Sequence, residues 1–132
     1  MTSESTEVVR RMYEAFHRGD AETALAHFDP EVVIDASARI DGGVGHGRDG
    51  VAEMIGGWIA TFDDWSEEIE ELREVGDHVY VASRQRGLGK GSGIETEFRY
   101  GVLYEVRGGL IARMVMFNDP AEALEAAGAR RP

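Results

Sequence analysis

The sequence contains no cysteine, has far fewer basic than acidic residues, and has no long apolar run. Without cysteine, disulfide bonds, thiolate nucleophiles and thiolate zinc sites are excluded. The 14 lysine and arginine residues against 25 acidic residues give a net charge of −11, which argues against a nucleic-acid partner and against docking on an anionic membrane. The longest nearly apolar run, residues 54–62, is far shorter than the ~20 residues that span a bilayer.

The N-terminal segment, residues 1–11, has no apolar stretch of the kind that a signal peptide carries, so a cytoplasmic protein is expected. The 132 residues, 42% of them hydrophobic, predict a single domain over 1–132 with its own core. The 17 glycines predict several tight turns or close backbone approaches.

Helical periodicity is clearest near the two ends of the chain. Val8, Met12 and Phe16 form an apolar stripe, and Gly19 is placed to end that helix. A short second helix follows up to about residue 28. The C-terminal helix has an N-cap, a proline at its first turn and a capping box, and it is expected to run over 119–128.

A third helix is expected from about residue 48 to residue 62, with Val51, Trp58 and Phe62 on its apolar side. Gly56 and Gly57 lie in its middle and cost it roughly 2 kcal/mol relative to alanine. Such a pair suggests that another element packs closely against the helix backbone.

Strands are expected at 31–36, 66–75, 78–88, 94–106 and 110–118. The segment 66–75 also fits a helix. Two-residue turn signals separate the second strand from the third and the fourth from the fifth. Helices early in the chain and an antiparallel meander late in it predict an α+β fold, with helices on one face of a sheet.

Glycine-rich motifs give no nucleotide site. Residues 45–50 match GxGxxG, but a long loop precedes them and hairpins follow, whereas a dinucleotide site needs a βαβ unit. The segment 87–93 lacks the Ser or Thr and the helix of a phosphate loop. The four histidines show no metal-ligand spacing, and only His46 lies in a loop suited to a site. We therefore expect no metal and no cofactor.

The acidic stretch 67–71 and the single residue Asp35 differ in their surroundings. The acidic stretch 67–71 is interpreted as a solvated strand face. Asp35 ends an otherwise apolar strand, where an acid is either a turn residue or a carboxylate facing a cavity.

Four segments together carry a resemblance to a known family: RRMYEAFHRGDAETALAHFDPEVV (10–33), GRDGVAEMI (47–55), RQRGLGKGSGIETEFR (84–99) and FNDPAEALEAAG (117–128). They resemble the SnoaL-like branch of the nuclear transport factor 2-like superfamily. The resemblance covers nearly the whole chain and implies a cone, in which a curved, mostly antiparallel sheet wraps around the N-terminal helices and encloses a pocket. It also implies that 66–75 is a strand. Members of the superfamily include isomerases, cyclases, epoxide hydrolases and domains that only bind or dimerise, so the site has to decide the function.

No complete catalytic set from a named branch is present. The resemblance to steroid isomerases places Asp35 at the position of their base. At the positions of their two oxyanion donors it places Met12, next to Tyr13, and Gly101, neither of which can donate a side-chain hydrogen bond. Such donors usually make the largest contribution to catalysis. The resemblance to epoxide hydrolases implies an Arg-x-Asp motif on the same strand. This sequence has the arginine, Arg99, but not the acid two residues later. Asp35 and Arg99 are the candidate catalytic residues.

If Asp35 faces inward, the two-residue period of strands predicts which strand side chains face the pocket. Asp35 and Arg99 are expected to contact a cavity capped by Trp58 and Phe62. The other pocket-lining residues are predicted to be Met12, Tyr13, Phe16, Val33, Met54, Ser83, Gln85, Glu97, Leu103, Arg113, Val115 and Phe117.

The opposite strand residues form an apolar and aromatic row that is predicted to lie outside the cone. This row is interpreted as the interface of a homodimer. Its members are Tyr80, Phe98, Tyr100, Val102, Tyr104, Met114 and Met116.

Three functions stay open at this point. The chain is a domain that binds a small apolar or amphipathic ligand, an isomerase- or cyclase-type enzyme that uses Asp35 on a carbonyl compound, or an epoxide-hydrolase-like enzyme. The missing oxyanion donors favour binding alone, whereas the charged pocket floor favours an enzyme.

Overall fold

A computed structural model describes residues 3–39 and 42–128. The elements are α1 (Glu4–His17), α2 (Ala21–Ala26), β1 (Phe28–Asp35), β2 (Val44–His46), α3 (Gly47–Ile59), β3 (Phe62–Val75), β4 (His78–Gly89), β5 (Glu95–Arg107), β6 (Leu110–Phe117) and α4 (Pro120–Ala126). The predicted α+β class, the element order and the strand at 66–75 are confirmed. The short strand β2 was not predicted, because its three residues lie in the glycine-rich segment expected to be a loop.

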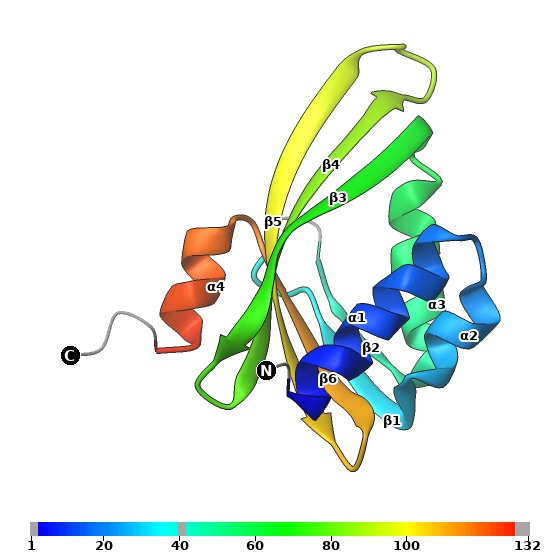
Figure 1. Ribbon diagram of the computed structural model, residues 1–132. Helices are drawn as coiled ribbons and strands as arrows, with labels where there is room; N and C mark the ends of the chain where they lie inside the picture. Colours follow the sequence, from blue (N-terminus) through cyan, green and yellow to red (C-terminus); the bar gives the residue numbers. More distant parts are fainter. Residues whose placement is uncertain (1–2, 40–41, 129–132) are drawn as a thin grey trace.

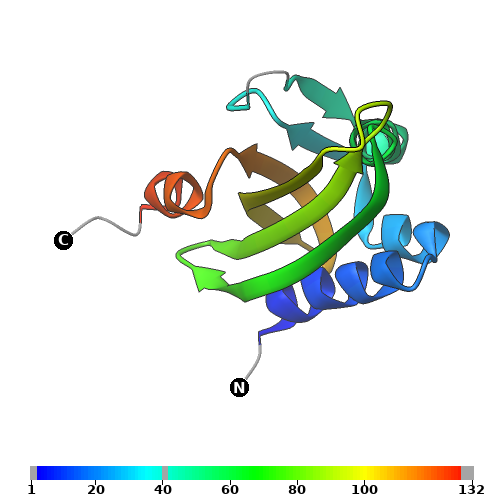
Figure 2. The same cartoon turned by 90° about the horizontal axis from the view of Figure 1, so that it is seen from above.

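The six strands form one sheet in the order β2-β1-β6-β5-β4-β3. All neighbouring strands are antiparallel except β1 and β6, which are parallel. The long strands curve strongly, and α1, α2 and α3 lie on one side of the sheet while α4 lies on the other (Figure 1). The view from above shows the sheet bending around the three N-terminal helices (Figure 2).

The helix ends follow the predicted chemistry. Ser3, Asp20 and Asp119 cap α1, α2 and α4 by accepting a hydrogen bond from a backbone N–H three residues later. No helix of the described residues is long and apolar enough to cross a membrane.

Strand β3 starts four residues earlier than predicted. Asp64 adopts a φ of 52°, the only positive φ of a described residue other than glycine. The pairing with β4 shifts its register between Asp63 and Ser66. The irregularity lets the strand begin directly after α3, so that Trp65 reaches the layer between the sheet and the helices.

Glycines in α3 and β2 have two different roles. A Cβ on Gly45 would lie 2.9 Å from both Ile34 Cγ2 and Met54 Sδ, so Gly45 allows β2 to pack tightly against β1 and α3. A Cβ on Gly56 or Gly57 would meet no atom within 4 Å. The predicted close packing against these two glycines is therefore wrong.

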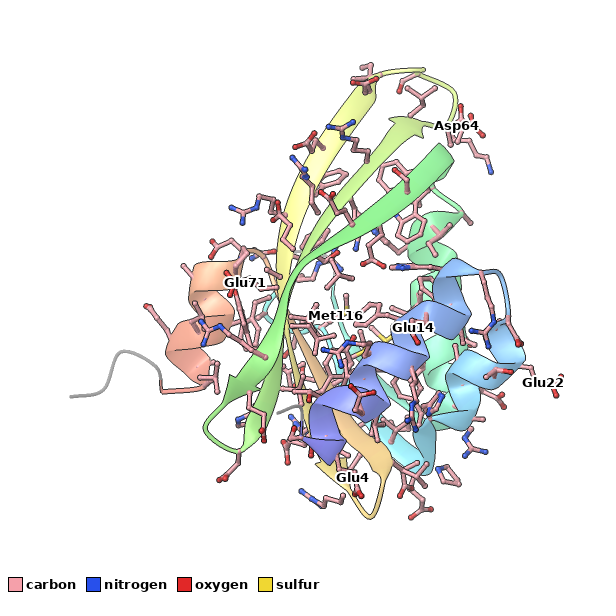
Figure 3. The ribbon with its side chains drawn as sticks, in the orientation of Figure 1. Glu4, Glu14, Glu22, Asp64, Glu71 and Met116 are labelled. Atoms are coloured by element: carbon pink, nitrogen blue, oxygen red, sulfur yellow. The ribbon has the colours of Figure 1, made fainter. Side chains whose placement is uncertain are left out.

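The register of the sheet fixes which residues share a face. One row across the strands joins Ile34, Met114, Tyr104 and Val79, and these residues belong to the core beneath α1, α2 and α3. The next row joins Asp35, Val115, Leu103 and Tyr80, and the last three of these lie in the smaller core beneath α4. Met116 lies on the side of the sheet that faces the helices, whereas Glu22 of α2 points away from it (Figure 3).

The predicted faces of β1, β5 and β6 are therefore wrong. Because side chains alternate along a strand, the wrong assumption about Asp35 inverted the positions predicted on these three strands, whereas Ser83 and Gln85 on β4 were assigned to the correct face. Residues turned away from the cavity, contrary to the prediction, are Val33, Asp35, Glu97, Arg99, Leu103, Arg113, Val115 and Phe117. The row predicted to form a dimer interface faces the helices instead at Phe98, Tyr100, Val102, Tyr104, Met114 and Met116.

Candidate functional site

A cavity of about 200 Å³ lies between the curved sheet and the three N-terminal helices. Most of its wall is apolar, including Met12, Phe16, Val102 and Met114. Three exposed residues of its wall, Ala21, Ala52 and Gly56, belong to α2 and α3. The cavity wall therefore reaches the protein surface at α2 and α3.

Two tyrosine hydroxyls meet in the cavity wall. Tyr13 of α1 and Tyr104 of β5 are both buried, and their oxygens lie 2.5 Å apart. Their rings are perpendicular, with centroids 6.0 Å apart. The pair has two hydroxyl protons, and the bond between the oxygens uses one of them. Among the described residues no acceptor bonds the second proton, which leaves one O–H available to a bound molecule.

Both tyrosines stay neutral far into the alkaline range. Burial raises the pKa of Tyr13 well above its ordinary value of 10, and the neighbouring Tyr104 and Glu67 raise it further. Burial also raises the pKa of Tyr104, although its hydrogen bond with Tyr13 acts in the opposite direction. The hydroxyls are therefore hydrogen-bond donors at physiological pH.

Alkaline titration should show this burial in all four tyrosines of the chain. Tyr80 and Tyr100 also have raised pKa values, again mainly because of burial. We expect little tyrosinate absorbance from the folded protein at about pH 10.5, where the unfolded chain in guanidinium is mostly ionised. Because the unfolded chain loses its phenolic protons first, the free energy of unfolding should fall as the pH rises above about 10. Four tyrosines that titrate normally in the folded state would contradict the buried pair.

A carboxylate and an amide form the second polar part of the wall. The side chain of Glu67 on β3 is 6% exposed. Its Oε2 accepts hydrogen bonds from Ser83 Oγ at 2.6 Å and from Gln85 Nε2 at 3.1 Å. Gln85 is itself fixed, because its Oε1 accepts from the indole N–H groups of Trp58 at 2.8 Å and Trp65 at 3.2 Å.

The other oxygen of this carboxylate leads out of the cavity. Glu67 Oε1 lies 2.8 Å from Nε2 of His17, at the last turn of α1. The His17 side chain is 34% exposed, and its ring packs beside Tyr13 and Phe16 at centroid distances of 5.8 and 5.7 Å. The contact between Glu67 and His17 thus connects the cavity wall with solvent.

Aromatic rings close the remaining side of the cavity. Trp58 packs edge-on against Phe62, Phe98 and Tyr100 at centroid distances of 5.0 to 5.8 Å. The guanidinium carbon of Arg39 lies 4.2 Å from the centroid of the Tyr100 ring and 4.7 Å from that of Trp58. This cation–π contact holds the two rings in place.

The two candidate catalytic residues lie outside the cavity. Arg113 donates a 3.0 Å hydrogen bond to Asp35, and Ser37 donates two. The hydrogen bonds from Ser37, and then the charge of Arg113, lower the pKa of Asp35. Arg99 is 56% exposed and donates to Glu70 at 2.9 Å. Asp35 and Arg99 therefore belong to separate ion pairs on the outer face.

The other residues predicted to line the pocket are divided between the faces. Met12, Tyr13, Phe16, Trp58 and Gln85 lie in the cavity wall. Phe62 packs on Trp58, Met54 packs against the main core, and Ser83 is buried and bonded to Glu67. The residues on the outer face are Val33, Glu97, Leu103, Arg113, Val115 and Phe117.

The predicted dimer surface contributes the cavity wall instead. Tyr100, Val102, Tyr104, Met114 and Met116 line the cavity, and Phe98 stacks on Tyr100. Tyr80 does face outward, but it is 1% exposed and packs beneath α4 with Ala123. Association of two copies stays a prediction, without this row as its basis.

The sequence interpretation missed Tyr104, Trp65, Glu67 and His17. A signal for Glu67 was present, because Trp65, Glu67 and Ile69 alternate with Ser66, Glu68 and Glu70 and so share one strand face. The interpretation of 67–71 as a solvated face is wrong for Glu67 and right for its exposed neighbours. The described residues contain no group of three or more His, Asp or Glu that could hold a metal ion.

The comparisons with known proteins agree with this architecture. Residues 9–114 match the family model of the SnoaL-like domain. The chain belongs to the SnoaL-like domain family. A search of curated proteins finds no match.

Solved structures similar to this SnoaL-like domain share the whole fold. A nuclear transport factor 2-like protein of unknown function from Burkholderia pseudomallei is 25% identical with a TM-score of 0.76, and the alignment covers 94% of this chain and 97% of that one. A protein of ketosteroid isomerase-like fold from Catenulispora acidiphila, solved with trimethylamine, is 19% identical with a TM-score of 0.72 and coverages of 97% and 95%. A protein proposed to be a polyketide cyclase, from Xanthomonas campestris pv. campestris, is 22% identical with a TM-score of 0.68 and coverages of 94% and 96%.

Proposed function

We propose that this SnoaL-like domain binds a small, mostly apolar molecule that carries a carbonyl oxygen, with that oxygen held by the hydroxyl pair of Tyr13 and Tyr104. The observation that carries the proposal is the pair itself, an unused O–H donor in an otherwise apolar cavity. A buried donor without an acceptor is unfavourable, so binding of a ligand oxygen that accepts this hydrogen bond is favoured.

The size and polarity of the cavity limit the ligand. A volume of about 200 Å³ lies below the usual ~300–1,000 Å³ of small-molecule sites, which favours a compact ring compound. The domain's net charge of −11 disfavours polyanionic ligands. A mono- or bicyclic ketone meets both conditions.

A matched pair of ligands tests the proposal. 1-Tetralone and tetralin have nearly the same shape, and only the first has a carbonyl oxygen. Both tryptophans of the chain lie in the cavity wall, so their fluorescence reports binding. We expect the ketone to bind about tenfold more tightly, since one net hydrogen bond contributes about 1 to 1.5 kcal/mol.

Tyrosine variants identify the donor. Either Tyr13→Phe or Tyr104→Phe alone leaves one hydroxyl proton for the ligand, so each single variant should keep the preference for the ketone. The double variant should bind both molecules equally. Tyr80→Phe, on the outer face, is the matched control. Equal binding of ketone and hydrocarbon by the unmodified protein would overturn the proposal.

A specific observation favours a second candidate function, an enzyme that moves a proton on the bound carbonyl compound. Glu67 lies in the same cavity wall as the two tyrosines, and a carboxylate beside a polarised carbonyl group has the chemistry of a general base. Asp35 and Arg99 do not support the enzyme candidates that were based on them, because both lie on the outer face.

A further inference from the structure

We propose that Glu67 is the base that exchanges a proton with the bound molecule, and that His17 passes this proton between Glu67 and solvent. The proposal rests on the proposed function, because the ligand's carbonyl oxygen must first be held by Tyr13 and Tyr104. It assigns to the site a catalytic carboxylate on β3 and a proton path through the end of α1.

The carboxylate of Glu67 is fixed from behind. Ser83 and Gln85 both donate to Oε2, and two indole N–H groups fix Gln85 in turn. Both N–H donors and both acceptor positions of the Gln85 amide group are thereby used on the protein, since its Nε2 also donates to Ser83 Oγ at 3.3 Å. Oε1 keeps a lone pair that the protein does not use, because His17 is its one partner among the described residues.

The partner of this carboxylate is an unusual choice for a purely structural role. Within the described residues, no lysine or arginine nitrogen lies within 4.0 Å of Glu67, whereas the exposed neighbours Glu68 and Glu70 both pair with Arg84. Arginine, which is always charged, is the usual partner of a carboxylate in a buried ion pair. Histidine instead gains and loses protons near neutral pH, as a proton path requires.

The path is continuous from the cavity to solvent. Glu67 lines the cavity and is nearly inaccessible to solvent, and its contact with His17 spans 2.8 Å. The imidazole is one-third exposed. A proton taken up inside the cavity therefore reaches water in two transfers.

The step balances without a cofactor. A Cα–H bond beside the ligand's carbonyl group breaks, its electron pair forms the enolate, and the enolate oxygen is stabilised by the tyrosine O–H. Glu67 takes the proton. While Glu67 is ionised, His17 donates Nε2–H to Oε1, because two lone pairs would repel each other at 2.8 Å. Once Glu67 is protonated, the neutral imidazole changes, by exchange with water, to the tautomer with hydrogen on Nδ1. It then accepts the Glu67 proton at Nε2 and loses the Nδ1 proton to water, which restores the starting state. Return of a solvent proton by the same route restores the ketone.

Deuterium exchange measures this step directly. In D2O, proton NMR follows the loss of the α-hydrogen signal of 1-tetralone, and fluorescence measures binding of the same molecule. We expect the unmodified protein to accelerate exchange above the buffer rate. Glu67→Gln should lower the protein-dependent rate by about 100-fold or more, with binding changed by less than about threefold. Glu67→Asp should keep part of the rate.

His17 is tested by rescue. His17→Ala should lower the exchange rate by roughly tenfold, and millimolar imidazole in solution should restore it, which a merely structural role of His17 would not allow. Glu68→Gln, the next residue but on the outer face, and His27→Gln are the matched controls and should exchange like the unmodified protein.

The possible outcomes separate the two proposals. Failure of 1-tetralone to bind overturns the proposed function and the proton path together. Binding without exchange, or exchange that persists in Glu67→Gln, overturns the proton path alone. Thermal unfolding shows whether Glu67→Gln is folded. If it is not, the exchange rate of Glu67→Asp and the imidazole rescue of His17→Ala decide whether the proton path exists.

Discussion

Val102→Asp is expected to remove most of the stability of this domain. Val102 is 3% exposed and lies in the cavity wall between the sheet and the helices. A carboxylate there has no partner, and an uncompensated buried charge costs about 3–5 kcal/mol. That is a large part of the ~5–15 kcal/mol by which domains are stable. Urea unfolding followed by circular dichroism measures the change.

The same acidic residue at an exposed aliphatic position is the control. Ile94, just before β5, is 66% exposed, and Ile94→Asp should change the free energy of unfolding by no more than about 0.5 kcal/mol. A Val102→Asp protein with normal stability and an altered mass in sedimentation would instead place Val102 on an outer, intermolecular face. That result would contradict the register described above.

Gly101→Val should destabilise the protein on the face of β5 that lies opposite to Val102 and packs against α4. A Cβ on Gly101 would lie 2.7 Å from Ala123 Cβ and 2.8 Å from both the Asp119 carbonyl oxygen and Pro120 Cα. Two of these atoms are backbone, so α4 has to move away from the sheet. Overpacking of this kind costs about 1–3 kcal/mol, measurable by urea unfolding.

Gly57→Ala is the matched control because a Cβ there meets no atom within 4 Å. Relief of the glycine penalty in the middle of α3 should raise the free energy of unfolding by up to about 1 kcal/mol. A Gly101→Val protein as stable as the original would show that α4 does not pack on β5.

The fold could be predicted from the sequence because its signals are local. The stripe of Val8, Met12 and Phe16 and the caps at Asp20 and Asp119 depend only on neighbouring residues. The resemblance of four segments to the SnoaL-like family then fixed how the elements assemble and decided the ambiguous segment 66–75.

The site could not be predicted as well, because strand orientation is a global property. On β5 both alternating sets contain apolar residues, so the period alone does not decide between Tyr104 and Leu103 for the interior. The structure shows that α4 covers Leu103 and that the helices cover Tyr104. Glu97 and Arg99 share the face of Leu103. Their charges favour an outward position for this face, and they are a stronger signal than the position of Asp35.

Contacts between distant segments carry the remaining chemistry. Tyr13 and Tyr104 are 91 residues apart, and His17 and Glu67 are 50 apart. Neither pair has a sequence motif. Both arise because the curved sheet brings β3 and β5 against α1, which only the three-dimensional arrangement reveals.

The central claim is that a tyrosine O–H in the cavity holds the carbonyl oxygen of a ligand. The most direct measurement is the 13C chemical shift of the carbonyl carbon in labelled 1-tetralone. A hydrogen bond to the oxygen moves this resonance downfield. We predict a downfield shift on binding to the unmodified protein that is absent in the double variant Tyr13→Phe/Tyr104→Phe. A bound ketone whose carbonyl resonance is the same in both proteins would contradict the account.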